Sequence, residues 1–94
     1  MLSGIRLKQK ITPVAAKFSA AGNVHRLSIL YMLAQGPLTL PVIIRRLKIS
    51  PSLTIHHLQI LRKSGWVSKS KFGKLVTYYL SDKAVKEVSA FLHK

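Results

Sequence analysis

The 94-residue sequence contains no cysteine and only two acidic residues, Asp82 and Glu87. Without cysteine, the chain forms no disulfide and no thiolate metal site. Because both acids lie after residue 81, most of the positive side chains have no partner for an ion pair nearby in the sequence. No apolar run approaches the roughly 20 residues that a helix needs to span a bilayer. We therefore expect no membrane segment and no cysteine chemistry.

The scarcity of acids also argues against catalysis. The sequence has no cysteine nucleophile and no glycine-rich phosphate loop, and its first 81 residues offer no carboxylate. A serine–histidine pair would lack an acid nearby in the sequence to orient the imidazole. The sequence therefore predicts a protein that is not an enzyme, with no catalytic residue and no cofactor.

Positive charge, by contrast, is abundant. Sixteen lysines and arginines against two acids give a formal net charge of +14. A folded chain with this charge repels itself, and binding to a polyanion relieves the repulsion. The composition favours nucleic acid as the partner, and an anionic membrane surface is the alternative.

Apolar spacing predicts two helices in the first third of the chain. The first covers about Ile5–Ala20, with a start or kink near Thr12 because Pro13 follows. Its apolar stripe consists of Ile11, Val14, Ala15 and Phe18. Asn23 caps the second helix, which ends at Gly36-Pro37. The stripe predicted to face the core there is Leu27, Leu30, Tyr31 and Ala34.

Two short helices and a tight connection follow. After the extended segment "PLTL", Thr39 is predicted to cap a third helix with Arg45 and Arg46 outward. Its inward residues are Val42, Ile43 and Leu47. The connection "KIS" then leads to a fourth helix that Ser50 caps, that Pro51 opens and that Gly65 ends. Two helices joined by so short a turn are typical of a helix-turn-helix.

After Gly65 the apolar period changes from helical to alternating. The segment "WVSKSKFGKLVTYYL" predicts a β-hairpin with its tip at Phe72-Gly73. Ser81 then caps a last helix with the stripe Val85, Val88, Phe91 and Leu92. The order α-α-(β)-α-α-β-β-α predicts a mainly α fold with a small β-hairpin, a single winged helix-turn-helix domain over residues 1–94.

The fourth helix has two chemically different faces. At about 100° per residue, the core face is Leu53, Thr54, His57, Leu58, Ile60 and Leu61, and the other is Ser52, Ile55, His56, Gln59 and Lys63, with Arg62 at its edge. Serine, histidine and glutamine read base edges, an aliphatic group contacts a thymine methyl, and cations reach phosphates. The second face predicts a helix that enters the major groove of DNA. The alternative is an ordinary amphipathic helix with a solvated polar face.

Three lysines, Lys69, Lys71 and Lys74, gather at the hairpin tip. A basic tip can follow the DNA backbone or enter the minor groove. A lysine-rich edge that prevents strand pairing is the alternative, and both roles are compatible.

The adjacent histidines His56 and His57 do not predict a metal site. Neighbouring helical residues diverge by about 100°, so they cannot chelate one ion together. We interpret His57 as a core-edge residue with a hydrogen-bond partner, and His56 as a DNA contact. His25 and His93 are isolated in the sequence, and we predict no metal ligands.

A known family shares these features. The matching residues are His25-Arg26-Leu27 with Ile29-Leu30, the run from Ser50 through His57-Leu58 and Leu61-Arg62 to Gly65 and Val67, and Gly73-Lys74 with Tyr78-Tyr79-Leu80. With them, the stretch from Gly22 to Ser81 resembles the winged-helix regulators of the arsenic-repressor (ArsR-like) group.

The resemblance implies a homodimer, built by terminal helices, that represses transcription from a palindromic operator. It places Ser52, Leu53, Ile55, His56 and Gln59 in the major groove. Relatives that respond to metals use cysteines on the third helix, or a carboxylate and histidines on the last. This chain has no cysteine, and Ala84 stands where a histidine would be expected. Ile55 replaces the small hydroxyl residue that relatives often carry.

The sequence thus predicts a cytoplasmic, nucleoid-associated regulator that binds double-stranded DNA specifically as a homodimeric repressor, without a metal-sensing site. Residues 1–22 and 81–94 are the predicted dimerisation helices. The predicted DNA-binding residues are Ser50, Ser52, Leu53, Ile55, His56, Gln59, Arg62, Lys63, Arg45, Arg46, Lys69, Lys71 and Lys74. A nucleoid-type architectural protein with little sequence preference is the alternative. RNA binding and a role as a subunit of a larger transcription complex are further alternatives, ranked behind these two. The sequence reveals no operator, regulated gene or effector, and repression is not separable from activation.

Overall fold

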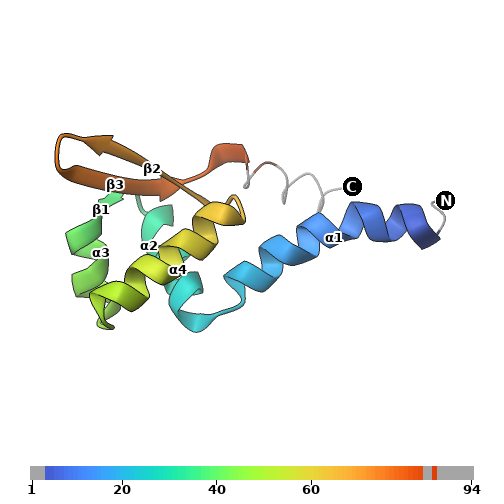
Figure 1. Cartoon of the computed structure of the whole chain (residues 1–94), viewed down its shortest axis with the longest axis horizontal. Coiled ribbons are helices and arrows are strands. Elements are labelled where there is room, and N and C mark those ends of the chain that lie inside the picture. The colour runs from blue at the N-terminus through green and yellow to red at the C-terminus, as the bar shows by residue number, and fades with distance from the viewer. Residues whose placement is uncertain (1–3, 84–85, 87–94) are drawn as a thin grey trace.

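The computed structural model describes residues 4–83 and 86. Its elements, in chain order, are α1 (Gly4–Ala21), α2 (Val24–Ala34), β1 (Leu38–Thr39), α3 (Leu40–Leu47), α4 (Pro51–Lys63), β2 (Val67–Phe72) and β3 (Leu75–Leu80) (Figure 1). This order confirms the predicted winged helix-turn-helix. The apolar stripe of the predicted last helix, Val85, Val88, Phe91 and Leu92, lies outside the described residues.

The three strands form one antiparallel sheet in the order β1-β3-β2. The hairpin of β2 and β3, here called the wing, pairs Val67 with Leu80 at its base and Phe72 with Leu75 at its tip. Two residues, Gly73 and Lys74, connect the strands, and Gly73 has a φ of 62°. A positive φ at the first of two loop residues suits the right-handed twist of a hairpin.

The core lies between α2, α3, α4 and the sheet. Its buried apolar side chains are Ala21, Ile29, Leu30, Leu33, Ile43, Leu58, Leu61, Val67 and Tyr78. The stripe predicted for α2 is therefore wrong except for Leu30. Leu27, Tyr31 and Ala34 are exposed, and Ile29 and Leu33 face the core in their place.

The predicted caps are present on two helices. The Asn23 side chain accepts hydrogen bonds from the backbone of His25 and Arg26, and the Ser50 hydroxyl accepts one from Leu53. Gly65, just after α4, has a φ of 83°, as expected of a residue that ends a helix. Thr39 occupies the N-cap of α3, but its side chain makes no capping hydrogen bond.

Helix α1 agrees with the predicted range Ile5–Ala20 and runs through Pro13, so of the two alternatives predicted near Thr12, a helix start is wrong. It projects from the rest of the molecule (Figure 1). With α1 included, the molecule measures 49 × 22 × 20 Å. Two hydrogen bonds hold its C-terminal part against the end of α4. The Trp66 indole donates to the Lys17 carbonyl at 2.6 Å, and the Lys17 ammonium donates to the Ser64 carbonyl at 3.3 Å.

Candidate nucleic-acid interface

The polar face predicted for α4 is an outward surface of the molecule. Ser52, Ile55, His56, Gln59, Arg62 and Lys63 are all exposed. Thr54, His57, Leu58 and Leu61, on the opposite side of the helix, are buried. Leu53 was predicted to face the core, but 41% of its surface is exposed. It therefore lies at the border of the two faces.

Local hydrogen bonds fix the start of α4. Besides capping the helix through its hydroxyl, Ser50 accepts hydrogen bonds at its carbonyl from the Thr54 backbone and from the Thr54 hydroxyl, both at 3.0 Å. Pro51 occupies the first turn, where its missing N–H removes no helical hydrogen bond. The first exposed residues of α4 are thus held on a rigid helix start.

His57 connects α4 to α2 through Arg26. An Arg26 Nη atom lies 3.1 Å from His57 Nδ1, and Arg26 Nε donates to the Ala20 carbonyl at 2.5 Å. This confirms the prediction that His57 has a hydrogen-bond partner. Sequence reasoning did not assign Arg26 to this role, because an arginine in an amphipathic helix usually faces solvent.

The environment of His57 favours its neutral form. Burial is the main cause that lowers the pKa of His57 below its ordinary value of 6.5, and the positive charge of Arg26 and the neighbouring His25 and His56 lower it further. Because a guanidinium only donates hydrogen bonds, Nδ1 must accept from Arg26. The proton of the neutral ring is then on Nε2.

The other cations of the predicted interface lie on α3 and on the wing. Arg45 and Arg46 are exposed on α3, and Lys69, Lys71 and Lys74 are exposed on the wing. Lys69 and Lys71 share the sheet face of the buried Val67, because alternate residues of a strand point to the same side. Lys69 and Lys71 therefore lie on the face of the wing that adjoins the helices, past the end of the core.

The wing tip carries an apolar side chain that the predicted interface omitted. Phe72 is 88% exposed, and its cross-strand partner Leu75 is exposed as well. Both lie on the sheet face opposite Lys69 and Lys71. The alternation from Val67 gives this orientation, but only the structure shows that nothing in the described chain covers Phe72.

The histidines do not form a metal centre in the described residues. The His57 ring lies with its centroid 5.5 Å from that of His25 and 6.0 Å from that of His56. No group of three or more His, Cys, Asp or Glu side chains in the described part of the chain is placed to hold a metal ion. Within the same residues, no helix is long and apolar enough to cross a membrane.

Comparison with known families explains this arrangement. Residues 23–69 match the sequence model of the bacterial regulatory proteins of the arsR family. The chain belongs to the arsR family. The match covers α2, the helix-turn-helix of α3 and α4, and the start of the wing, so it includes most of the surface described above.

Two transcriptional regulators align over most of the chain. The uncharacterized HTH-type transcriptional regulator MJ1325 of Methanocaldococcus jannaschii is 43% identical over 82 residues, which cover 85% of this chain and 91% of the relative. A cadmium resistance transcriptional regulatory protein, the CadC homolog of Staphylococcus aureus, is 36% identical over 90 residues, covering 93% of this chain and 74% of the relative.

Solved structures agree with the fold over nearly the whole chain. Reduced HlyU from Vibrio cholerae superposes with a TM-score of 0.79 at 32% identity, covering 94% of this chain and 93% of HlyU. The homodimeric winged helix-turn-helix DNA-binding domain of Mb0332 from Mycobacterium bovis superposes with a TM-score of 0.78 at 25% identity, covering 98% and 84%. The arsR-family chain described here is thus a DNA-binding transcriptional regulator and not an enzyme.

Proposed function

We propose that this chain is a repressor that binds a palindromic operator as a homodimer, with α4 of each copy in a major groove. The exposed face of α4 carries the proposal. His56 and Gln59 present hydrogen-bonding groups, and Ile55 presents an aliphatic group, on a helix whose opposite face is fixed in the core. A surface of this kind is complementary to base edges.

The side chains divide into two classes by what they can contact. Ser52, His56 and Gln59 hydrogen-bond to base edges, and Leu53 and Ile55 contact thymine methyl groups. The Ser50 hydroxyl is used as the cap, so Ser50 contributes by orienting the helix start beside a phosphate. The backbone cations are Arg45, Arg46, Arg62, Lys63, Lys69, Lys71 and Lys74.

The proposed dimer uses residues 1–22 and 81–94 as its contacts. In α1, Phe18 and Ala15 are exposed along the helix that projects from the body, which supports a contact with a second copy. The side chains of Ile11 and Val14 lie outside the described part of the chain. The domain of Mb0332 is homodimeric. The α4 helices of the two copies would then lie in major grooves about 34 Å apart.

We further propose that the chain acts on the chromosome in the cytoplasm. We also propose that metal binding does not trigger its release from DNA. Support comes from the sequence, which lacks cysteine, and from the positions of the described histidines, which do not converge on one ion. Adding cadmium or zinc to a preformed complex with operator DNA is expected to leave its affinity unchanged. Metal-dependent release in a gel-shift titration would contradict this part.

The division between base contacts and backbone contacts is testable by mutation. After selection of bound sequences from random duplex DNA, His56→Ala and Gln59→Ala should each cost about 1–3 kcal/mol on the selected site and little on random DNA. Lys74→Ala should weaken binding to both DNAs alike. Fluorescence anisotropy with both duplexes measures the difference. Equal losses for the two classes of variant on the two duplexes would reject the assignment.

A second candidate is an architectural protein that coats DNA with little sequence preference. The formal net charge of +14 favours the architectural protein, because this charge is larger than the number of operator phosphates that a regulator needs to neutralise. Footprinting separates the two. A protected palindrome supports the repressor, and uniform protection along the duplex supports the architectural protein.

A further inference from the structure

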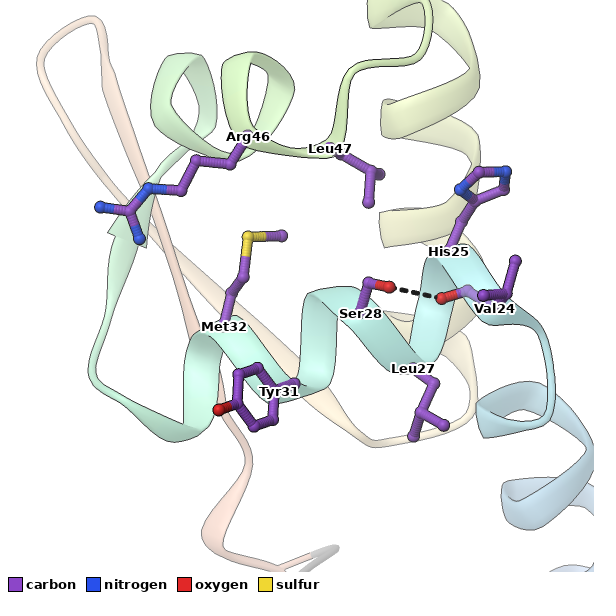
Figure 2. Close-up of a pocket in the computed structure, with 8 residues that line it drawn as sticks. All are labelled: Val24, His25, Leu27, Ser28, Tyr31, Met32, Arg46 and Leu47. Atoms are coloured by element: carbon purple, nitrogen blue, oxygen red, sulfur yellow. Dashed lines mark hydrogen bonds between the residues drawn. The ribbon is translucent and has the colours of Figure 1, made fainter.

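A groove between α2 and α3 lies outside the proposed base-reading face. It is open to solvent, has a volume of about 520 Å³ and is lined by Val24, His25, Leu27, Ser28, Tyr31, Met32, Arg46 and Leu47. Figure 2 shows Met32 and Ser28 pointing from α2 toward α3 and Leu47 pointing from α3 toward α2, while Arg46 extends from α3 toward β1 at one end of the groove and Leu27 and Tyr31 lie on the side of α2 away from α3. Its volume falls in the range of about 300–1,000 Å³ that small-molecule sites occupy.

The walls of the groove are apolar and exposed. Val24 and Tyr31 are each 71% exposed, and Leu27 is 57% exposed. At about 100° per residue, the lining residues of α2 span an arc of roughly 160° beside the core face of Ile29 and Leu33. A mostly apolar arc of this width, interrupted by Ser28 and bordered by His25, is left uncovered by the chain's own described elements and is a typical binding surface.

The polar groups of the groove select the charge of a ligand. Arg46 provides the permanent charge, and His25 and the Tyr31 hydroxyl add hydrogen-bonding groups. The Ser28 hydroxyl already donates to the Val24 carbonyl at 2.7 Å. The groove is lined by no carboxylate, and the first 81 residues contain none. An anionic group therefore meets one cation and no acidic neighbour.

We propose that this groove binds a small organic anion with an aromatic or branched hydrocarbon body. The body would lie against Val24, Leu27, Met32 and Leu47, and a carboxylate or sulfonate would pair with the Arg46 guanidinium. A second copy of the chain is the competing occupant. The two acidic residues of the sequence, Asp82 and Glu87, belong to the segment 81–94 that is proposed for the dimer contact, so the dependence of probe binding on chain concentration tests this alternative.

The ligand would act on DNA binding through Arg46. This part of the inference rests on the proposed function. Arg46 belongs to the proposed backbone contacts, and one guanidinium cannot hold a ligand anion and a phosphate at full strength together. Ligand binding therefore lowers affinity for DNA, and by reciprocity DNA lowers affinity for the ligand.

The binding site can be tested without DNA, with 8-anilinonaphthalene-1-sulfonate as the probe. Titration of the full chain is expected to give a saturable rise in fluorescence with one probe per chain. Arg46→Gln and Leu27→Asp should each weaken probe binding about tenfold or more. Arg45→Gln is the matched control, because Arg45 is the exposed neighbour of Arg46 outside the groove lining and loses the same charge.

Several results would overturn the site. They are an absence of saturable fluorescence, equal losses for Arg45→Gln and Arg46→Gln, no effect of Leu27→Asp, and loss of probe binding as the chain dimerises with rising concentration. Circular dichroism on each variant confirms that the fold is kept.

A second titration tests the coupling. Saturating probe is expected to weaken binding of the selected duplex to the wild type and to Arg45→Gln, and to leave Arg46→Gln unaffected. Unchanged DNA affinity in the wild type would reject the coupling. Selective DNA binding without probe binding would reject the groove alone, and probe binding without selective DNA binding would reject the proposed function alone.

Discussion

At the scale of single residues, the contact between Arg26 and His57 has a pH dependence built into it. The contact needs a neutral imidazole, because Arg26 can only donate to Nδ1. Burial, with the positive charge of Arg26, lowers the pKa of His57 in the folded chain. The unfolded chain therefore binds this proton at a higher pH than the folded chain does.

From this difference we predict that acid destabilises the fold. The contribution of His57 is fully present above its unfolded pKa of about 6.5 and is lost as the pH falls below that value. Urea unfolding followed by circular dichroism should give a lower free energy of unfolding at pH 5 than at pH 7.5. His57→Gln should flatten this dependence, whereas the exposed His56→Gln, which removes only the smallest cause of the lowered pKa of His57, should change it much less. Greater stability at pH 5 in the wild type would contradict the prediction.

Phe72 gives a second prediction at this scale. An aromatic side chain that is 88% exposed at a basic hairpin tip can insert between base steps in the minor groove. Phe72→Ala should reduce affinity for the selected duplex by about 1–3 kcal/mol and reduce DNA bending in a circular-permutation gel assay. Leu75→Ala, at the cross-strand position, should have a smaller effect. Unchanged affinity and bending for Phe72→Ala would show that the tip stays outside the groove.

At the scale of elements, the end of α4 depends on Gly65. Its φ of 83° disfavours any residue with a Cβ, and a Cβ there would lie 3.1 Å from the Lys17 ammonium. Gly65→Ala should therefore cost about 1–2 kcal/mol of stability. Gly22→Ala is the control, because Gly22 lacks a positive φ and its Cβ would stay 3.4 Å from the nearest atoms. Equal urea midpoints for the two variants would contradict this account.

The elements also differ in how far sequence predicts them. In α4, polar and apolar residues separate cleanly around the helix, so its exposed face is correctly predicted except for the border residue Leu53. In α2, apolar residues occur almost all round the helix, and Arg26 points inward to His57. Periodicity cannot decide which apolar side of α2 is covered, because tertiary contacts make that choice. The groove beside α2 was unpredictable for the same reason.

At the scale of the whole molecule, the projecting α1 predicts assembly. Light scattering at tens of micromolar should give the mass of a dimer. Phe18→Asp should shift the equilibrium toward monomer, because it places a charge in an exposed apolar position of α1. Ser19→Asp adds the same charge at the neighbouring exposed position and should disturb the dimer less. A wild-type monomer with and without DNA would contradict the proposed assembly.

The two hydrogen bonds that Lys17 makes with Trp66 and Ser64 have a consequence for operator geometry. They join α1 to the C-terminal end of α4, so the orientation of α1 is tied to that of α4. If two copies associate through α1, the crossing angle of the α1 helices also fixes the separation and tilt of the recognition helices. The number of base pairs between half-sites would then be set by residues that never touch DNA.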